Sequence, residues 1–384
     1  MTDNFDTLRR PEDRALNASL QGLKILLVSP FPPWYHGGVQ KVIGETAKRL
    51  VVEHDVSVEI WSGDLTSTAS LNWNGVPVRT YKTRRWQGYA SLAMLKELKR
   101  DSKRFDVVHA HGSGPIVPLI AALARGTTPL VFSAYFHPQA STLAGVPAKF
   151  VYDRLCNAYI FNKANRIICD SDTERKCVQQ RFRLPASSLT TIPPGIDSAR
   201  ITEAKPHDVE YTLILSVGRL EKYKQNQLMI EAIKLLPTHY RFYIIGKGGY
   251  QRKLEAIIQK CQLGKRVKIL DSCSDDEMYR WLKTCSVMTN LSEIESFGIT
   301  VLEALAAGKG AIVNNKLGLA EIARKFPGAV FPINSTEIDP VTLAKMVQEV
   351  AGKRIDVRNL GEFQWDRIAS QVLKVYEDVC SYAK

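Results

Sequence analysis

Apolar runs and amphipathic stretches alternate along this chain from about residue 23 onward. The run LKILLVSP at 23–30 is continuously apolar, as expected of a strand buried on both faces, and VQKVIGETAKRLVVEH at 39–54 has helical spacing. Strand signals recur at 56–63, 106–112, 129–137, 166–172, 212–218, 241–247, 266–272, 286–292 and 310–315. Strands that alternate with helices form parallel sheets covered on both faces. The sequence therefore predicts a doubly wound α/β protein.

The series of strands pauses at LTTIPPGIDSARITEAKPHD, residues 189–208, which is rich in proline and turn residues. A chain of 384 residues also exceeds what one hydrophobic core usually serves. We therefore predict an N-terminal domain over 1–200 and a C-terminal domain over 205–365, both Rossmann-like. Ligands of such sheets bind beyond the carboxyl ends of the strands, so two of them in tandem would face a central cleft.

Bulk composition indicates a soluble, cytoplasmic chain. No apolar stretch approaches the roughly 20 residues of a membrane span, and the polar N-terminus MTDNFDTLRRPEDRALN is not a signal peptide. The seven cysteines are scattered without a C-x-x-C pair, which suggests reduced thiols. The net charge is +13, but no nucleic-acid-binding module is visible, so nucleic acid is not an expected partner.

The densest basic segment is RTYKTRRWQGYASLAMLKELKRDSKR, residues 79–104. It has nine basic and two acidic residues, with Tyr81, Trp86 and Tyr89 interleaved. Such a segment suits an anionic membrane surface or an acidic ligand. A solvated helix face with extended lysine side chains explains it equally well. The first interpretation would place the protein peripherally on the inner face of the membrane.

In the second half of the chain, two cations follow the strand signal of TLILSVGRLEKYK. Arg219 and Lys224 lie in the loop just past the strand. Arginine offers a fork of donors and lysine a point charge, and together they suit a diphosphate. Either cation could instead be an ordinary surface residue. Arg219, directly after Val-Gly, favours a functional role.

The stretch ESFGITVLEALAAGKG places a loop before a helix that begins near Gly298 and ends at Gly308. Free backbone amides at 298–300 and the helix dipole favour a phosphate there, and Thr300 could add a hydroxyl donor. A carboxylate beside a phosphate would be repelled. Glu295 and Glu303 should therefore accept hydrogen bonds from neutral hydroxyls, such as those of a ribose and a sugar. Glu303, within VLEALAA, is expected to be buried.

Three histidines follow strand signals of the first domain. His137 ends an apolar strand on the cleft side, where it could bond a sugar hydroxyl; a packed strand-end histidine is the alternative. His109 and His111 should point to the same face, because alternate residues of a strand do so. One or both could line the acceptor side, and the sequence leaves this open.

Several familiar motifs are incomplete or better explained otherwise. Asp170-Ser-Asp172 spells the D-x-D pattern of a metal site, but Ser171 or Asp172 as a helix N-cap explains it better. GKGGYQRK and AAGKGAI do not complete a P-loop, and no G-x-G-x-x-G follows the first strand. A P-loop NTPase and a dehydrogenase are therefore not expected, and the D-x-D residues are not expected to hold a metal.

The segment Glu295-Ser-Phe-Gly-Ile-Thr-Val-Leu-Glu303 resembles the paired-glutamate signature of retaining glycosyltransferases of family 4, which have the GT-B fold. LLVSPFPPWYHGGVQKVIGETAKRL is similar to the glycine loop of that family, and SVGRLEKYK is similar to its Gly-Arg…Lys loop. IPPGID looks like the entry into its second domain, with Pro194 where asparagine is usual. The resemblance extends from about residue 24 to 380.

The resemblance implies a role for each matching residue. Arg219 and Lys224 would hold the donor diphosphate, Glu303 the ribose, and Glu295 the donor sugar. The remaining implied contacts are His137 near the transferring sugar, Gly37 and Gly38 close to the phosphate, and the amides of Phe297, Gly298, Ile299 and Thr300 on sugar and phosphate. A C-terminal helix at about 366–384 would cross back onto the first domain.

The implied reaction is transfer of a sugar, with retention, from a nucleotide-diphosphate sugar to a hydroxyl acceptor. UDP is favoured as the nucleotide, and the acceptor would be a glycan, a lipid-linked molecule or a small molecule. Two alternatives stay open. One is a nucleotide-sugar epimerase or hydrolase of the same fold, and the other is a non-catalytic partner subunit of a glycosyltransferase.

Overall fold

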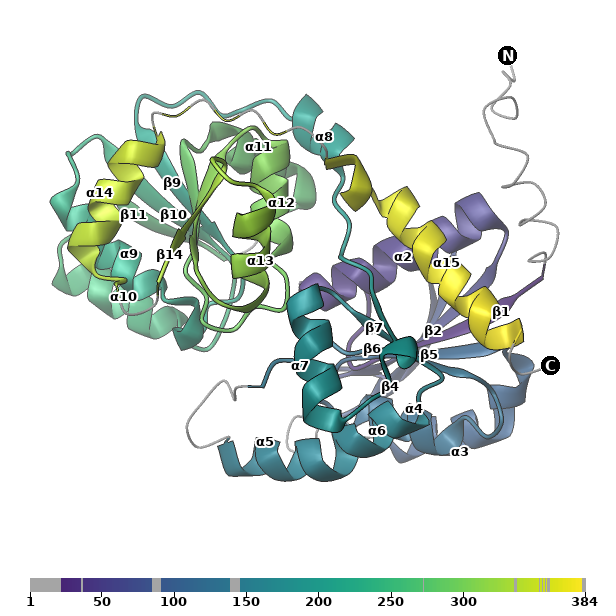
Figure 1. The fold of residues 1–384 in the computed structure, drawn as a ribbon. Coiled ribbons are helices and arrows are strands. Elements are labelled where there is room, and N and C mark those ends of the chain that lie inside the picture. The colour runs from purple at the N-terminus through teal and green to yellow at the C-terminus, as the bar shows by residue number, and fades with distance from the viewer. Residues whose placement is uncertain are drawn as a thin grey trace, which may run out of the picture.

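The computed structural model describes residues 22–35, 37–84, 91–138, 146–271, 273–334, 337–351, 353, 355, 357 and 360–381. Within them, the chain forms two α/β domains, and a long C-terminal helix returns from the second domain to the first (Figure 1). No helix among these residues is both long enough and apolar enough to cross a bilayer.

The first domain is built on an eight-stranded sheet. Its strands are β1 (Lys24–Ser29), β2 (Ser57–Asp64), β3 (Ala69–Trp73), β4 (Val76–Lys82), β5 (Val107–His111), β6 (Leu130–Ser133), β7 (Arg166–Cys169) and β8 (Leu189–Thr191). They lie in the order β3-β4-β2-β1-β5-β6-β7-β8. All neighbours are parallel except β3 and β4, which form an antiparallel hairpin.

The β3–β4 hairpin changes the interpretation of the basic segment 79–104. Its turn is Asn74-Gly75, and both residues have positive φ, as a two-residue hairpin turn requires. Strand β4 carries Tyr81 inward, where it is 1% exposed, so Tyr81 is not available to a membrane surface. That part of the expectation was wrong, because the strand alternation buries the ring. Trp86 and Tyr89 lie outside the described residues.

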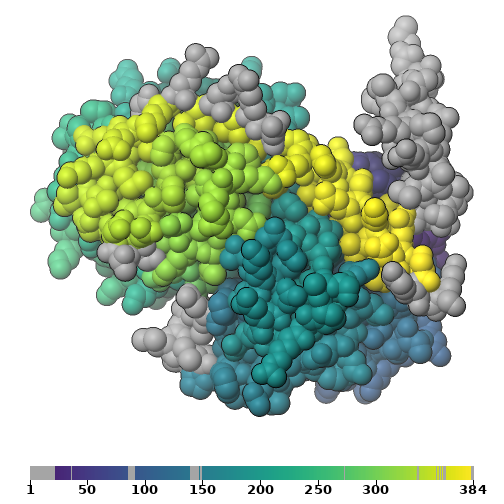
Figure 2. All heavy atoms as spheres, viewed as in Figure 1, coloured from purple at the N-terminus to yellow at the C-terminus, as the bar shows by residue number. Residues whose placement is uncertain are grey.

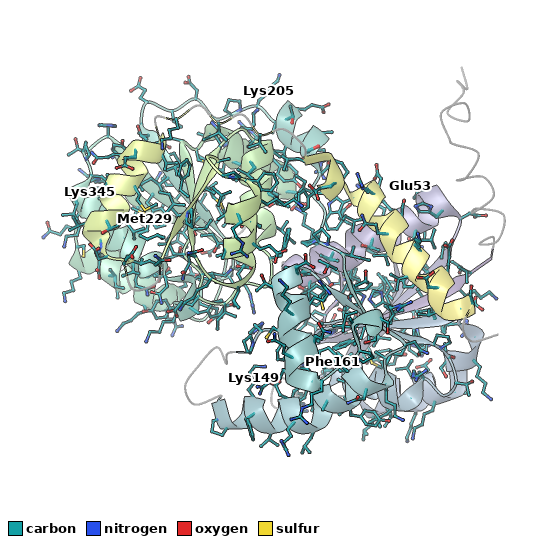
Figure 3. The ribbon with its side chains drawn as sticks, viewed as in Figure 1. Glu53, Lys149, Phe161, Lys205, Met229 and Lys345 are labelled. Carbon is teal, nitrogen blue, oxygen red and sulfur yellow. The ribbon has the colours of Figure 1, made fainter. Side chains whose placement is uncertain are left out.

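Helices cover both faces of the first sheet. They are α2 (Gly38–His54), α3 (Leu92–Asp101), α4 (Val117–Ala124), α5 (Val146–Tyr152), α6 (Ala158–Lys163), α7 (Asp172–Phe182) and the C-terminal α15 (Trp365–Ser381). One apolar core lies between the sheet and α3, α4, α6 and α7. A second core lies on the opposite face, beneath α2 and α15. Glu53 marks the end of α2 that lies beside α15 (Figure 3).

The second domain contains a six-stranded, all-parallel sheet in the order β11-β10-β9-β12-β13-β14. Its strands are β9 (Thr212–Val217), β10 (Tyr240–Ile245), β11 (Val267–Leu270), β12 (Val287–Asn290), β13 (Gly310–Asn314) and β14 (Val330–Ile333). Its helices are α8 (Ser198–Glu203), α9 (Asn226–Ala232), α10 (Gln251–Lys260), α11 (Asp275–Thr284), α12 (Ile299–Ala306), α13 (Leu317–Lys325) and α14 (Pro340–Ala351). Helices α11 to α13 pack on one face, and α9, α10 and α14 on the other.

The two crossings between the domains lie side by side. The amide of Ile196 donates to the carbonyl of Phe363 at 2.7 Å, and Ile196 pairs with Gln364 in a parallel bridge. A Cβ on Gly195 would lie 2.5 Å from the ring of Trp365, which is 1% exposed. The outgoing and returning segments therefore pack as one unit, which fixes where α15 begins.

Candidate active site

Helix α12 begins beside Gly38 of the first domain. Its N-cap, Gly298, has φ 112°, in the left-handed region, and no side chain caps the helix. A Cβ at this position would lie 2.8 Å from Leu319 Cδ2, so both conformation and space require glycine. Ile299 and Thr300 are half-buried in the first turn. This end of the helix therefore presents backbone amides and a positive dipole, which suit an anion.

Glu303 lies one turn further along α12 and is 1% exposed. Lys41, on α2 of the first domain, donates to its Oε1 at 2.6 Å. Burial raises the pKa of Glu303, and the ammonium of Lys41 opposes that rise. Burial alone would lower the pKa of Lys41, but Glu303, Tyr279 and Asp275 outweigh it and raise that pKa. The Lys41–Glu303 pair joins the two domains.

Lys224 and Glu295 form a second ion pair at the cleft. Lys224 Nζ lies 2.5 Å from Glu295 Oε2, and both side chains are largely shielded from solvent. Lys224 ends a short 3-10 turn after β9, and Arg219 lies in the same loop. Arg219 donates to the hydroxyl of Tyr223 at 2.9 Å, which directs its guanidinium. The two cations of the sequence motif thus lie near the loop before α12.

His137 belongs to the first domain, and charged residues of the second domain affect its pKa. Burial and the nearby ammonium of Lys149 lower its pKa to about 4, while Glu295 acts in the opposite direction and Arg219 adds to the decrease. Lys149 extends from α5, below α7 (Figure 3). The electrostatic influence of Glu295 and Arg219 indicates that His137 lies near these two residues of the second domain. At neutral pH its ring is uncharged, so it can donate or accept a hydrogen bond.

The glycine loop of the first domain faces the start of α12. Gly37 is the N-cap of α2, with an extended backbone, and Gly38 is the first residue of that helix. A Cβ on Gly38 would lie 3.5 Å from Ile299 Cδ1. Phe297 is buried and packs on Phe363, with ring centroids 5.9 Å apart. The structure thus gathers residues from 37 to 303 around one end of α12.

Asp170, which the sequence marked only as part of a D-x-D pattern, contacts the second domain. Ser171 caps α7, accepting from the amide of Glu174 at 3.1 Å, which confirms the N-cap interpretation. Ser296 of the second domain donates to Asp170 at 3.3 Å, and Ser171 donates to the carbonyl of Ser296 at 2.9 Å. Burial raises the pKa of Asp170 to about 7; the Ser296 hydrogen bond lowers it and Glu295 raises it.

A further contact between the domains involves Glu321 on α13. Its carboxylate accepts from the amide of Asp172 at 3.1 Å, and from the amide and hydroxyl of Thr173 at 2.8 and 2.7 Å. A carboxylate of the second domain therefore caps a helix of the first. The surfaces of α7 and of the second domain meet at this point (Figure 2).

His109 and His111 point to the same face, as expected, with ring centroids 4.0 Å apart. Both are buried. His109 bonds the hydroxyls of Tyr376 on α15 at 2.7 Å and Ser133 at 2.8 Å, and His111 bonds that of Tyr135 at 3.2 Å. Burial lowers the pKa of His111 to about 3. These contacts tie the end of β5 to the C-terminal helix.

Comparison with known proteins agrees with this geometry. Residues 36–200 match the model of "Glycosyltransferase Family 4", and residues 197–349 match that of "Glycosyl transferases group 1". Among solved structures, sucrose-phosphate synthase from Thermosynechococcus elongatus superposes with a TM-score of 0.77 at 15% identity, covering 94% of this chain and all of that one. Anabaena HepE in complex with UDP-glucose gives 0.68 at 17% identity, covering 94% and 99%.

Two curated relatives share less than a quarter of their aligned residues with this chain. A D-inositol 3-phosphate glycosyltransferase of Xylanimonas cellulosilytica is 23% identical over 319 residues, 75% of each chain. A GDP-mannose:cellobiosyl-diphosphopolyprenol alpha-mannosyltransferase of Komagataeibacter xylinus is 22% identical over 328 residues, 81% of this chain and 80% of the relative. The fold is GT-B, and the chain is a glycosyltransferase. It belongs to the glycosyltransferases of family 4.

Proposed function

We propose that this protein transfers a hexose from a nucleotide-diphosphate hexose to an acceptor hydroxyl, with retention of configuration at the anomeric carbon. The observation that carries the proposal is the convergence of the open α12 N-terminus, the Lys224–Glu295 pair and the buried Glu303 at one edge of the cleft. These groups match a donor with a diphosphate in the middle, a ribose on one side and a sugar on the other.

The proposed roles follow from charge and hydrogen-bonding capacity. In the transfer, the bond from the anomeric carbon to the diphosphate oxygen breaks, and a bond to the acceptor oxygen forms on the same face. The acceptor proton passes to the leaving diphosphate. Negative charge would therefore grow on the diphosphate, and Arg219, Lys224 and the α12 amides would stabilise it. Glu303 would accept from the ribose hydroxyls.

Glu295 and His137 would hold the sugar that moves. Glu295 lies beside Lys224, so its carboxylate would reach the region between diphosphate and sugar. The neutral ring of His137 suits a sugar hydroxyl better than a phosphate, because it brings no cation. From the family resemblance we also propose that the reaction uses neither a metal nor a cofactor. Activity that persists in excess EDTA would support the absence of a metal.

UDP is the proposed donor nucleotide, and Anabaena HepE, of the same fold, was solved with UDP-glucose. Incubation with labelled UDP-, GDP- and ADP-hexoses, with and without acceptor extracts, tests the reaction. A labelled glycoside of retained configuration that forms only with acceptor supports transfer. Free labelled sugar or an epimer, formed equally without acceptor, would instead favour a hydrolase or epimerase. No turnover of any donor would favour a partner subunit.

We also propose a lipid-linked acceptor at an anionic membrane. Helix α3 carries Leu92, which is 77% exposed, together with exposed Lys96 and Lys99. On the same side of the first domain, α5 exposes Phe150 and Val151 (Figure 1). Apolar side chains beside lysines suit an anionic lipid surface. The relative from Komagataeibacter xylinus acts on a polyprenol-linked acceptor by its name.

Liposome flotation at low salt tests the membrane proposal. We expect binding to vesicles with anionic lipid and little binding to zwitterionic ones, and a loss of binding in the double variant Lys96→Glu/Lys99→Glu. Lys345→Glu, at an exposed lysine of the second domain (Figure 3), is the matched control. Equal flotation of all three proteins, or none by the wild type, would contradict a role for this surface.

A further inference from the structure

Among the ion pairs of the described residues, the Lys41–Glu303 pair is the one that joins α2 to α12. Lys41 lies in the first turns of α2, just after the glycine loop, and its ammonium contacts three groups of the second domain. These are Glu303 at 2.6 Å, the hydroxyl of Tyr279 at 3.2 Å and Asp275 at 3.8 Å. A cation near a helix N-terminus opposes the helix dipole, so this position is unfavourable for α2 itself.

The negative charge of Glu303 depends on the ammonium of Lys41. Its carboxylate is 1% exposed, and no second cation lies within ion-pair distance of it among the described residues. A buried carboxylate without a partner takes up a proton instead of keeping its charge. A protonated Glu303 would offer one acceptor oxygen fewer to a ribose, because its hydroxyl becomes a donor. The acceptor function proposed for Glu303 therefore requires Lys41.

We propose that Lys41 is a positioning residue for the donor nucleotide, which acts from the first domain by holding the Glu303 carboxylate ionised and aimed at the ribose hydroxyls. The inference rests on the proposed function, and it adds a residue of the opposite domain to the donor site. Since Lys41 and Glu303 meet only when the domains are close, the same contact links donor binding to the approach of the two domains.

The surroundings of the pair determine how it responds to pH. Glu303 faces Lys41 from α2 and Asp275 from α11, and these act on it in opposite directions. Tyr279 of α11 contacts Lys41, and Arg200 of α8 lies over the Tyr279 ring, 5.5 Å from its centroid. Removing the charge of Lys41 leaves Asp275 as the nearest charge to Glu303. Glu303 should then take up its proton at a higher pH.

The experiment compares Lys41→Met, Lys41→Arg and Glu303→Gln with Lys48→Met, at an exposed lysine of the same helix. Steady-state kinetics are measured from pH 5.5 to 8.5, with thermal unfolding as a check that each variant is folded. For Lys41→Met we expect the donor KM to rise about tenfold to a hundredfold, with a smaller change in kcat. The rise should be largest at the acid end, because a lower pH favours protonation of Glu303. Lys41→Arg should restore most of the affinity.

The double variant Lys41→Met/Glu303→Gln separates positioning from a purely structural ion pair. If Lys41 acts through Glu303, the double variant should be no worse in donor KM than Glu303→Gln alone, and its low-pH loss should disappear. An ion pair that only stabilises the fold would lower the melting temperature of Lys41→Met and leave its KM and pH profile like those of Lys48→Met. That outcome would overturn the inference, whereas a wild type that transfers no sugar would overturn the proposed function.

Discussion

The ammonium of Lys224 lies 2.5 Å from the carboxylate of Glu295. The two side chains come from loops 71 residues apart, one after β9 and the other before α12. On the proposed roles, a diphosphate that reaches Lys224 would share this ammonium with Glu295, and the carboxylate would be directed past the phosphate toward the sugar. The pair would then set both the charge that meets the leaving group and the position of the carboxylate that meets the sugar.

Removal of the Lys224 charge should slow the reaction more than it weakens binding. We expect Lys224→Ala to lower kcat by about 10²- to 10³-fold, because the cation meets charge that grows in the transition state. Acceptor KM should change little. Lys222→Ala, at an exposed lysine of the same short turn, is the control. Unchanged kcat in Lys224→Ala would remove Lys224 from this role.

His137 should stay neutral across the physiological range. Its pKa of about 4 lies below the usual value near 6.5, chiefly because of burial. Between these two pH values the unfolded chain binds a proton that the folded chain rejects, so this group makes stability rise with pH there. An NMR titration of the histidine rings measures the midpoint, with His137→Asn for assignment. A midpoint near 6.5 would show that the ring is exposed and not held in the cleft.

Gly298 should tolerate no side chain. Gly298→Ala forces a left-handed alanine against Leu319, and we expect about 1–3 kcal/mol of lost stability together with weaker nucleotide binding. Gly308→Ala is the matched control, because Gly308 also has positive φ but has open space around its Cβ position, at the other end of the helix. Calorimetry should show weakened binding of UDP to Gly298→Ala alone. Equal binding by both variants would separate the α12 N-terminus from the phosphate.

Glu321 should hold the domains together without touching the donor. Glu321→Ala removes three hydrogen bonds to residues 172 and 173, which we expect to weaken the contact between domains by on the order of 1–3 kcal/mol. Small-angle scattering should then report a larger radius of gyration than for the wild type. Glu349→Ala, at an exposed position on α14, is the control. A radius unchanged by Glu321→Ala would assign the closed arrangement to the other contacts.

Much of the fold could be predicted because its strands carry a local signal. Every apolar run that the sequence marked as a strand corresponds to a strand of the two sheets. Strand β3 escaped notice because its residues Ala69–Trp73 are mostly exposed and show no apolar run, although Asn74-Gly75 is a hairpin signal. Strand β14 was also not predicted. It is short and contains Pro332, and proline weakens a strand prediction even at the edge of a sheet.

The candidate site was less accessible to sequence reasoning, because part of it depends on distant pairs. The burial of Glu303 could be anticipated from its apolar neighbours, but Lys41, its partner, is 262 residues away. The charge of Lys41 so near a helix start was the available hint. Asp170 and Ser296 are 126 residues apart in the sequence, and no local sequence pattern predicts their hydrogen bond. The D-x-D sequence pointed to this segment as a possible metal site, whereas in the structure Asp170 contacts the second domain.

Thermal unfolding with free nucleotides tests the donor site most directly. A ligand at 100 times its Kd stabilises a folded protein by about 2.7 kcal/mol, which is a measurable rise in melting temperature. We predict that UDP raises the melting temperature of the wild type, that GDP and ADP do so less, and that Glu303→Gln loses most of the shift while Lys48→Met retains it. If UDP, GDP and ADP all leave the wild type unchanged, or if Glu303→Gln responds like the wild type, the account of this cleft as a nucleotide-sugar site is contradicted.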